Sequence, residues 1–450
     1  MIFQFMLHKP STFKWLAALG VFFIMVPAPV VKAKAMIGVQ TAIANSASIT
    51  DFGAVGDGQT LNTEKIQSAI DQLAAKGGGT LVIPRGVFLS GAIFLKPGVD
   101  LHLDPGAVLK GSTNIMDYPK IKTRIEGHFE EWLPALINAD HCDHLRITGS
   151  GALDGSGDIF YAEFWAARRK DPQVTNLAVE RPRLALIQNS RDVQISGITF
   201  TNSAFWNLHL YRCRNVLVEN VRFGVPDQLR CPSTDGTDID SCQYVTIRGC
   251  DYRVDDDCIG LKGSKGPLAM DDKESPPVEH IRVSDCTFER GNGVVTLGSE
   301  ATLVRDVVVK NCKVNGMVNV AVLKLRPDTP QDYEDIHYRN ITLNGGGAIL
   351  HVQPWMQFFD LNGQAPPKSV VSDVTLSDIK GKFGSLGVIR GTPNQTEIHG
   401  ITLENINVQV ENPRLNAVGV KDLRIKNVTV NGKPLSVQDS VGKLTGSPRG

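Results

Sequence analysis

The sequence lacks a surplus of charge of either sign, because 47 Lys and Arg residues balance 47 Asp and Glu residues. Bulk charge therefore gives no reason to expect a nucleic-acid partner. After residue 35 the sequence also lacks an apolar run long enough to cross a membrane, which takes about 20 residues. What remains is the profile of a globular protein, since a chain of 450 residues with 42% hydrophobic residues can bury a large core.

The first 35 residues differ from the rest. Two lysines precede the apolar run 15–30, and a small-x-small cleavage pattern ends at Ala35. The run is short for a membrane span and contains two prolines, which argues against an uncleaved anchor. We therefore predict a signal peptide at 1–35, export to the periplasm or the extracellular space, and no membrane attachment after cleavage.

A dinucleotide fingerprint is also missing, because the glycine-rich stretch 49–58 does not have its spacing. One amphipathic helix follows, with Asn62 placed to cap it and Gly77 placed to end it. Its apolar residues recur at i, i+3, i+4 and i+7, at Ile66, Ala69, Ile70 and Leu73. Short β-like runs come next, up to Leu103. We expect 49–110 to form a cap region, in which this helix covers one end of a β-structure.

From about residue 133 the chain carries a loose repeat, in which a strand-like alternation leads through a polar turn to an apolar sixth position. That position recurs every 22 to 38 residues, at Ile198, Val221, Cys250, Cys286, Cys312, Ile341, Ile379, Ile406 and Val428. One unit is too small to bury its own apolar face, so the units must stack. Propellers need longer units, and leucine-rich repeats need their leucine frame. We therefore predict an all-β fold, a right-handed single-stranded parallel β-helix at 36–450 with a tail at 436–450.

The repeat also assigns the cysteines and a row of asparagines. Cys250, Cys286 and Cys312 share the apolar sixth position, so we expect buried free thiols, with oxidation of neighbouring thiols as the alternative in an exported protein. An Asn recurs at the turn, at Asn220, Asn311, Asn340, Asn405 and Asn427. It predicts a structural ladder that bonds backbone groups.

The stretch 233–263 carries an excess of carboxylate for a half-buried β-segment. Within it, Asp235 lies 21 residues before Asp256 and 22 before Asp257, an interval of about one coil, so these three are expected side by side on adjacent coils. Hydrolysis of a glycosidic bond needs one protonated carboxyl and one carboxylate, and crowded carboxylates raise one another's pKa. A calcium site and a solvated edge are the two alternative interpretations.

Longer excursions between strands, at 110–134, 154–183, 262–279 and 351–368, are expected to build the binding surface. Their Trp, Tyr and Phe side chains suit stacking on sugar rings or plain anchoring of the loops.

Several short motifs then follow one another in a fixed order. They are Asp51-Phe-Gly-Ala-Val-Gly-Asp-Gly, Gly77-Gly-Gly-Thr, Ser233-Thr-Asp-Gly, Asp256-Asp-Cys, Gly291-Asn-Gly and Gly298-Ser-Glu. In this combination the sequence resembles the polygalacturonase family, glycoside hydrolase family 28, over about 49–430. The resemblance implies a right-handed parallel β-helix and hydrolysis, usually with inversion, of galacturonic acid linkages in pectin.

By this resemblance Asp256 matches the general acid, while Asp235 and Asp257 match the pair that holds and deprotonates the attacking water. In an inverting enzyme the acid and the base are expected roughly 6.5–9.5 Å apart. The sequence departs from the family at Ser233, which replaces Asn, and at Asn292, which replaces the His that supports the acid.

A third departure concerns substrate binding. Lys324-Leu-Arg326 replaces the family's Arg-Ile-Lys, so both cations are kept in reversed order, and Lys324, Arg326 and Asn292 are candidate substrate-binding residues. Arg181 and Arg183 are candidates to clamp a uronate carboxylate, with loop salt bridges as the alternative. Trp206 and His209, one coil before Asp235, are candidates for a substrate wall, with core packing as the alternative.

The sequence predicts a glycoside hydrolase that needs no cofactor and no metal. Its expected partner is a pectic polysaccharide or an oligogalacturonide, and its expected state is a monomer. Three alternatives remain: a hydrolase of the rhamnogalacturonan backbone from the same family, a calcium-dependent pectate lyase, and a non-catalytic carbohydrate-binding β-helix.

Overall fold

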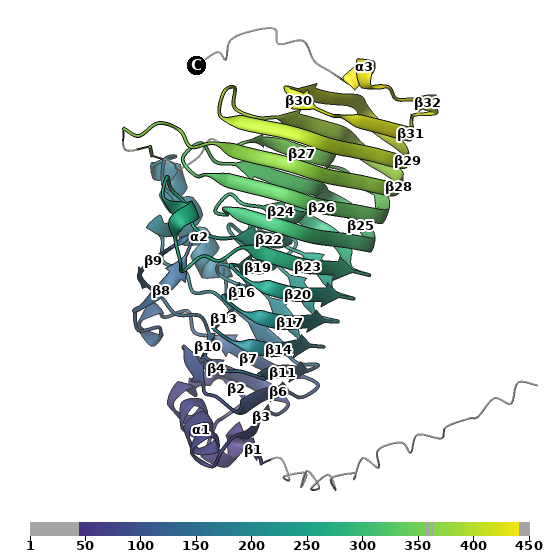
Figure 1. Cartoon of the computed structure of the whole chain (residues 1–450). Helices are drawn as coiled ribbons and strands as arrows, with labels where there is room; N and C mark the ends of the chain where they lie inside the picture. The colour runs from purple at the N-terminus through teal and green to yellow at the C-terminus, as the bar shows by residue number, and fades with distance from the viewer. Residues whose placement is uncertain (1–44, 356–359, 362, 441–450) are drawn as a thin grey trace, which may run out of the picture. The chain divides into compact units, whose positions relative to one another are not determined.

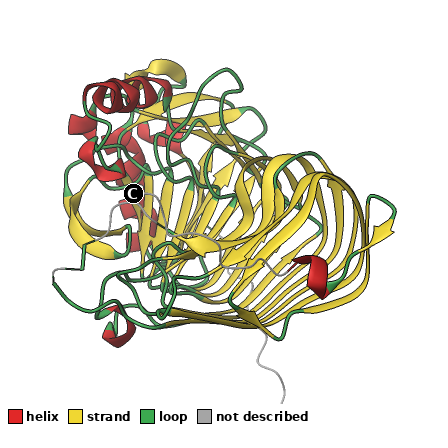
Figure 2. Cartoon of the chain, turned by 90° about the horizontal axis from the view of Figure 1, so that it is seen from above, coloured by secondary structure: helices red, strands yellow, loops and turns green. Residues whose placement is uncertain are grey.

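Strand follows strand around a common axis, and each coil lies on the one before it (Figure 1). The computed structural model describes residues 45–355, 360–361 and 363–440, in which 30 strands join one sheet almost wholly through parallel pairs. This confirms the predicted right-handed parallel β-helix, and Figure 2 shows the stacked strands seen from above. The predicted signal peptide at 1–35 lies outside the described residues, as does most of the predicted tail. None of the helices in the described ranges is long and apolar enough to span a bilayer.

The strands form three rows along the stack. The row that carries the site described below begins with β5 (Ile93–Leu95), β10 (Ile137–Asp140), β13 (Ala185–Gln188), β16 (Leu208–Tyr211), β19 (Thr237–Asp240) and β22 (Ile259–Lys262). A second row begins with β1 (Ser46–Ser48), β3 (Gly79–Ile83), β6 (Val99–Leu103), β11 (Arg146–Gly149), β14 (Arg191–Ser196), β17 (Arg214–Glu219), β20 (Gln243–Arg248) and β23 (Val278–Ser284). The third begins with β2 (Asp57–Leu61), β4 (Gly86–Ser90), β7 (Ala107–Gly111), β12 (Ala152–Asp154), β15 (Thr199–Thr201), β18 (Arg222–Gly224) and β21 (Asp251–Arg253).

Toward the C-terminus the strands lengthen, and single strands pass from one row into the next. They are β24 (Thr287–Leu297), β25 (Leu303–Leu325), β26 (Gln331–Asn344), β27 (Ala348–Pro354), β28 (Ser369–Arg390) and β29 (Thr396–Val418), followed by β30 (Val420–Lys421), β31 (Arg424–Val430), β32 (Lys433–Pro434) and the short helix α3 (Val437–Ser440). Four 3-10 turns complete the list: η1 (Ile49–Phe52), η2 (Ile115–Asp117), η3 (Asn176–Ala178) and η4 (Ala269–Asp271).

The interior is filled by every second side chain of each strand, because neighbouring side chains point to opposite faces. The predicted sixth position is one inward row: Cys312 pairs with Ile341, Ile341 with Ile379, and Ile379 with Ile406, and all four are buried. All eight cysteines are buried. The predicted burial of Cys250, Cys286 and Cys312 inside the stack is therefore confirmed, and their state as free thiols stays a prediction.

The turn asparagines form the predicted ladder. Asn220, Asn311, Asn340, Asn405 and Asn427 all have φ between 50° and 56°, in the left-handed region that Asn tolerates better than most residues. Asn340 Nδ2 donates to Asn311 Oδ1 at 2.8 Å, and Asn427 Nδ2 donates to Asn405 Oδ1 at 2.9 Å. These bonds link side chain to side chain across coils, whereas the sequence predicted bonds to the backbone.

The predicted helix is α1 (Thr63–Ala75), whose buried face covers the first coils. Asn62 precedes it but does not cap it. Its Oδ1 accepts from Val55 N at 2.8 Å and its Nδ2 donates to Val55 O at 3.0 Å. The predicted cap was wrong because the Asn62 side chain satisfies the backbone of the preceding loop instead.

Two further elements, absent from the sequence-based prediction, lie beside the row that carries the site. One is the antiparallel hairpin of β8 (Ile121–Ile125) and β9 (His128–Trp132), and the other is helix α2 (Asp158–Lys170). In Figure 1 both lie on the same flank of the stack. They form the wall of the cavity described next.

Candidate active site

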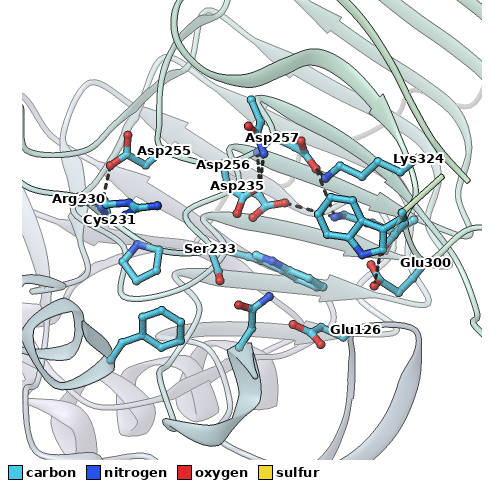
Figure 3. Close-up of a pocket in the computed structure, with 18 of the residues that line it drawn as sticks. Glu126, Arg230, Cys231, Ser233, Asp235, Asp255, Asp256, Asp257, Glu300 and Lys324 are labelled. Atoms are coloured by element: carbon cyan, nitrogen blue, oxygen red, sulfur yellow. Dashed lines mark hydrogen bonds and ion pairs between the residues drawn. The ribbon is translucent and has the colours of Figure 1, made fainter. Parts of the chain in front are cut away.

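The register of two neighbouring strands brings the three predicted aspartates together. Thr237 of β19 pairs with Ile259 of β22, and Gly236 N donates to Asp257 O at 2.9 Å. Asp235 and the Asp256–Asp257 pair stand just before these strands, so they lie on adjacent coils as predicted. One oxygen of each carboxylate lies within 4.8 Å of one oxygen of the other two, and Figure 3 shows the three groups pointing toward one another.

This spacing is tighter than expected. The nearest oxygens are closer than the roughly 6.5–9.5 Å that separate the acid and the base of an inverting enzyme. The nearest oxygens of the three carboxylates are therefore closer than the separation expected between acid and base. The choice between inversion and retention then depends on the hydrogen bonds and ion pairs that orient each carboxylate.

Lysines hold two of the carboxylates. Lys262 Nζ lies 3.3 Å from Asp235 Oδ2 and 3.8 Å from Asp257 Oδ2. Lys324 Nζ lies 2.7 Å from the same Asp257 oxygen, and Thr296 Oγ1 donates to Asp257 Oδ1 at 2.7 Å. Both oxygens of Asp257 are thus engaged, which fixes its orientation. Two ammonium groups inside the cluster also repel any added cation, so the calcium interpretation is disfavoured.

Asp256 is the most exposed of the three and faces the cavity. Its Oδ1 accepts from Asp257 N at 3.0 Å and from Asn292 Nδ2 at 3.3 Å. Asn292 N also donates to Asp256 O at 2.8 Å. Asn292 therefore contacts Asp256 with both its backbone and its side chain, at the place where the resemblance put the acid's support.

Burial and mutual repulsion favour protonation of this cluster. Burial, with the Asp238 and Asp256 carboxylates, raises the pKa of Asp235 well above its ordinary value. Burial and the neighbouring Asp257 raise the pKa of Asp256. Burial lowers the pKa of Lys262, but Asp235 and Asp238 outweigh it and raise that pKa. A cluster with these shifts keeps a proton on a carboxyl while its lysines stay charged, which is the state that acid–base catalysis needs.

The carboxylates open into a cavity of about 380 Å³, within the range of roughly 300–1,000 Å³ that is typical of small-ligand sites. Aromatic side chains line it from three sides: Phe164 and Trp165 of α2, Trp206, and Trp355 after β27. Lys324 Nζ lies 4.8 Å from the centre of the Trp355 ring. Flat rings beside carboxylates make a site suited to a sugar, which presents an apolar face and many hydroxyl groups. Of the predicted aromatics, Phe358 and Phe359 lie outside the described residues.

Comparison with known proteins agrees with this geometry. The family model described as Glycosyl hydrolases family 28 matches residues 77–436. The chain belongs to this family.

A probable polygalacturonase of Vitis vinifera is 36% identical to this protein over 267 residues, which are 57% of this chain and 52% of that protein. The chain thus spans about half the length of that relative. An exopolygalacturonase of Zea mays is 25% identical over 378 residues, 81% of this chain and 83% of that one. Among solved structures, the hyperthermoactive exopolygalacturonase from Thermotoga maritima superposes with a TM-score of 0.70 and 25% identity, covering 87% of this chain and 93% of the other.

The remaining candidate residues of this family 28 protein divide into two groups. Asn292, Lys324, Arg326 and Trp206 line the cavity. Arg326 is held there by Asp328, which accepts from its Nε and Nη2 at 2.7 Å each, and its Nη1 lies 3.5 Å from Glu300 Oε1. Its guanidinium is therefore fixed in orientation before any substrate arrives.

Arg181, Arg183 and His209 form the other group, with exposed fractions of 0, 1 and 0%. Arg181 donates to the carbonyl oxygens of Ala204, Pro232 and Asn176. Its guanidinium also lies 4.5 Å from the Phe164 ring centre and 4.6 Å from that of Phe205. The predicted clamp on a uronate carboxylate is corrected accordingly, because Arg181 is enclosed by protein on every side.

Arg183 and His209 bind each other. Arg183 Nη1 lies 2.8 Å from His209 Nδ1 and donates to Arg124 O at 2.7 Å, while Arg183 Nη2 donates to Thr123 Oγ1 at 2.9 Å. Their predicted contact with substrate is corrected in the same way. They tie hairpin β8–β9 to β13 and β16.

Several polar residues of the site were missed from the sequence, among them Glu126, Lys265 and Asp238. Glu126 at the tip of hairpin β8–β9 and Lys265 after β22 line the cavity, with Lys265 Nζ 3.9 Å from Glu126 Oε2. Asp238 is 0% exposed, and Lys262 Nζ lies 3.6 Å from its Oδ1. The available signal was the pattern Thr123-Arg-Ile-Glu-Gly-His, two polar-apolar runs joined by Glu-Gly, which is typical of a hairpin turn.

Proposed function

We propose that this enzyme hydrolyses the glycosidic bonds between galacturonic acid residues of pectic polysaccharide, with inversion. The observation that carries the proposal is the trio Asp235, Asp256 and Asp257, in which Asp256 faces the cavity and the other two carboxylates are oriented by lysines. Family membership and the polygalacturonase relatives support the substrate class.

In the proposed mechanism, protonated Asp256 transfers its proton to the glycosidic oxygen as the bond to the anomeric carbon breaks. A water held between Asp235 and Asp257 attacks that carbon from the opposite side and gives up a proton to this pair. The proton returns to Asp256 after the product leaves. Asp257 accepts from Lys324 and Thr296 at 2.7 Å each, so its oxygens are better placed to hold a water than to bond carbon, which supports inversion over retention.

The cations of the cavity suit an acidic sugar. Lys324, Arg326 and Lys265 all line the cavity, where Lys265 Nζ lies 3.9 Å from Glu126 Oε2. A uronate carboxylate exchanges part of its hydration for such donors, and charge-assisted hydrogen bonds are about twice as strong as neutral ones.

Product analysis on homogalacturonan and on rhamnogalacturonan, side by side, tests the proposal. We expect saturated galacturonate products from homogalacturonan, and an NMR spectrum in which the first-formed anomer is the inverted one. Asp235→Asn, Asp256→Asn and Asp257→Asn should each abolish turnover and leave the circular dichroism spectrum unchanged. Products from rhamnogalacturonan alone, or unsaturated products absorbing in the ultraviolet, would contradict the proposed substrate or reaction.

We further propose export after cleavage at Ala35 and a monomeric state. The N-terminal apolar run and its small-x-small pattern support export. The N-terminal sequence of the protein recovered from periplasm or medium checks the cleavage, and light scattering checks the mass. A mature protein that still begins at residue 1 would contradict the signal peptide.

A further inference from the structure

One row of outward-facing side chains runs along the site and changes from buried to exposed. In the strand register His209 is followed by Asp238, then by Gly260, Thr296 and Val322, and then by His351, Val388 and Asn416. His209 and Asp238 are 0% exposed although they point away from the interior of the stack. His351 and Val388 are half-buried, and Asn416 is exposed. Thr296 and Val322 are buried as well, so this face of the β-helix is covered as far as Val322 and becomes accessible from His351 onward, toward the C-terminus.

Hairpin β8–β9 provides the cover. Its Arg124 is 1% exposed and donates from Nε to Asp240 Oδ2 at 3.0 Å, and its Phe129 packs edge-on against Tyr211 with ring centres 5.7 Å apart. Asp240 and Tyr211 belong to β19 and β16, so the hairpin lies across the face where the groove would continue toward the N-terminus. A buried, hydrogen-bonded ion pair is costly to open once formed, so this cover is fixed rather than a lid.

The tip of the hairpin closes the cavity itself. Glu126 and Gly127 form the turn, with φ of 40° and 79°. A Cβ on Gly127 would lie 2.9 Å from Gly263 O and 3.1 Å from Glu300 Cβ, so the tip rests directly on the segment after β22. Glu126 and Glu300 both line this end of the cavity (Figure 3). Two carboxylates at a closed end accept hydroxyl groups and repel a further uronate.

The open side has the opposite character. A second cavity of about 610 Å³ lies over β27, β28 and β29, and the described residues that line it include His351 and Arg414 but no Asp or Glu. In the strand register Lys324 pairs with Gln353 of β27. The neighbouring residue of β27, Val352, pairs with Ile389 of β28, so Arg390, which follows Ile389, lies beside Gln353. Cationic and neutral side chains thus lead from the catalytic cavity toward the C-terminal coils.

From this asymmetry we propose that the enzyme acts at a chain end: the terminal sugar occupies the cavity closed by Glu126, and the rest of the galacturonate chain leaves over β27, β28 and β29, where Arg390 and His351 contact it. This inference rests on the proposed function and adds its mode of attack. A cavity of this size, closed toward the N-terminus, holds a short segment and excludes a chain that continues in both directions.

The products formed from homogalacturonan at the earliest times test the mode directly. We expect only the smallest product, mono- or digalacturonate, and reducing ends that rise while the viscosity of the solution hardly falls. A ladder of intermediate oligomers with a rapid loss of viscosity would overturn the inference and leave the proposed function intact. Absence of any hydrolysis would instead remove the proposed function.

Length dependence tests the open side. For Arg390→Ala we expect the ratio of kcat/KM on the hexamer to kcat/KM on the dimer to fall by about two- to five-fold, because a single exposed charge contact contributes little. Arg339→Ala is the matched control, since Arg339 is exposed on β26, away from both cavities. An unchanged ratio in Arg390→Ala and in the double variant Arg390→Ala/Arg414→Ala would overturn the proposed path of the chain.

Discussion

Replacing Lys262 by Met tests the electrostatic argument most directly. The Lys262 ammonium lies 3.3 Å from Asp235, 3.6 Å from Asp238 and 3.8 Å from Asp257, and only 7% of its side chain is exposed. Methionine has a similar length and no charge. The substitution therefore removes the cation that Asp235 and Asp238 share and leaves the packing almost unchanged.

The expected effect follows from the sign of the interaction. Lys262 favours the charged form of Asp235 and opposes the rise of its pKa, so removing Lys262 raises that pKa further. Breaking a buried ion pair costs roughly 3–5 kcal/mol. Because 1.36 kcal/mol corresponds to a tenfold change, a loss of about 3 kcal/mol lowers the ionised fraction of the carboxylate that receives the water proton by roughly 100-fold on the acidic side of the profile. The acidic limb of the kcat/KM profile should therefore move to higher pH.

The assay is a pH profile of kcat/KM on an oligogalacturonide, measured where circular dichroism shows the variant to be folded. We expect kcat/KM to fall by about 100-fold on the acidic side and to recover partly as the pH rises. Lys265→Met is the control, because Lys265 lines the same cavity but pairs with Glu126 at 3.9 Å. If the acidic limb of Lys262→Met stays where it is in the wild type, the assigned role of Lys262 is wrong.

Three further outcomes can be checked. Asn292→His places a titratable donor beside Asp256. When this histidine is protonated it stabilises the Asp256 carboxylate and lowers the pKa of Asp256, so the alkaline limb of the kcat profile should move to lower pH. Asn292→Gln should leave that limb in place. Burial raises the pKa of Asp238 to about 7, so the native protein binds more protons than the unfolded chain between about pH 4 and pH 7 and loses stability as the pH rises through that window. The melting temperature of Asp238→Asn should therefore rise relative to that of the wild type from pH 4 to pH 7. A difference in melting temperature that stays constant over this range would contradict the argument. Removal of divalent cations with a chelator should leave activity unchanged, since Lys262 and Lys324 already supply the counter-charge; a loss restored by calcium would contradict the hydrolase mechanism.

The β-helix and the aspartate trio could be predicted because both depend on spacing along the coil. Inward residues such as Ile341 and Ile379 recur once per coil, and parallel pairing stacks them. The interval from Asp235 to Asp257 equals one coil, so the same rule that stacks apolar residues places these carboxylates side by side. Such features follow from local sequence alone.

Burial on the outer face could not be predicted in this way. His209 points away from the interior of the stack, and Arg183 lies just before β13, in the row of strands that carries the site. From the sequence, both were therefore candidates for contact with substrate. They are buried because Thr123 and Arg124, more than fifty residues earlier, cover them. The residues around Arg183 do not predict its burial, because the hairpin that covers it is inserted in an earlier coil.

The two halves of this enzyme's specificity therefore have separate origins in the chain. The proposed acid–base groups Asp235, Asp256 and Asp257 belong to the coils, whose register allows little variation without exposing the core. The closed end belongs to hairpin β8–β9, which is held to the coils by Arg124 and Asp240. A longer or shorter excursion at 121–132 would change how much of the face is covered and leave the register of the catalytic coils as it is. On the proposed function, the mode of attack can therefore change while the reaction stays the same, because the hairpin and the catalytic coils are separate parts of the chain. This is why the spacing of the coils led to a proposal for the reaction and gave none for the mode of attack.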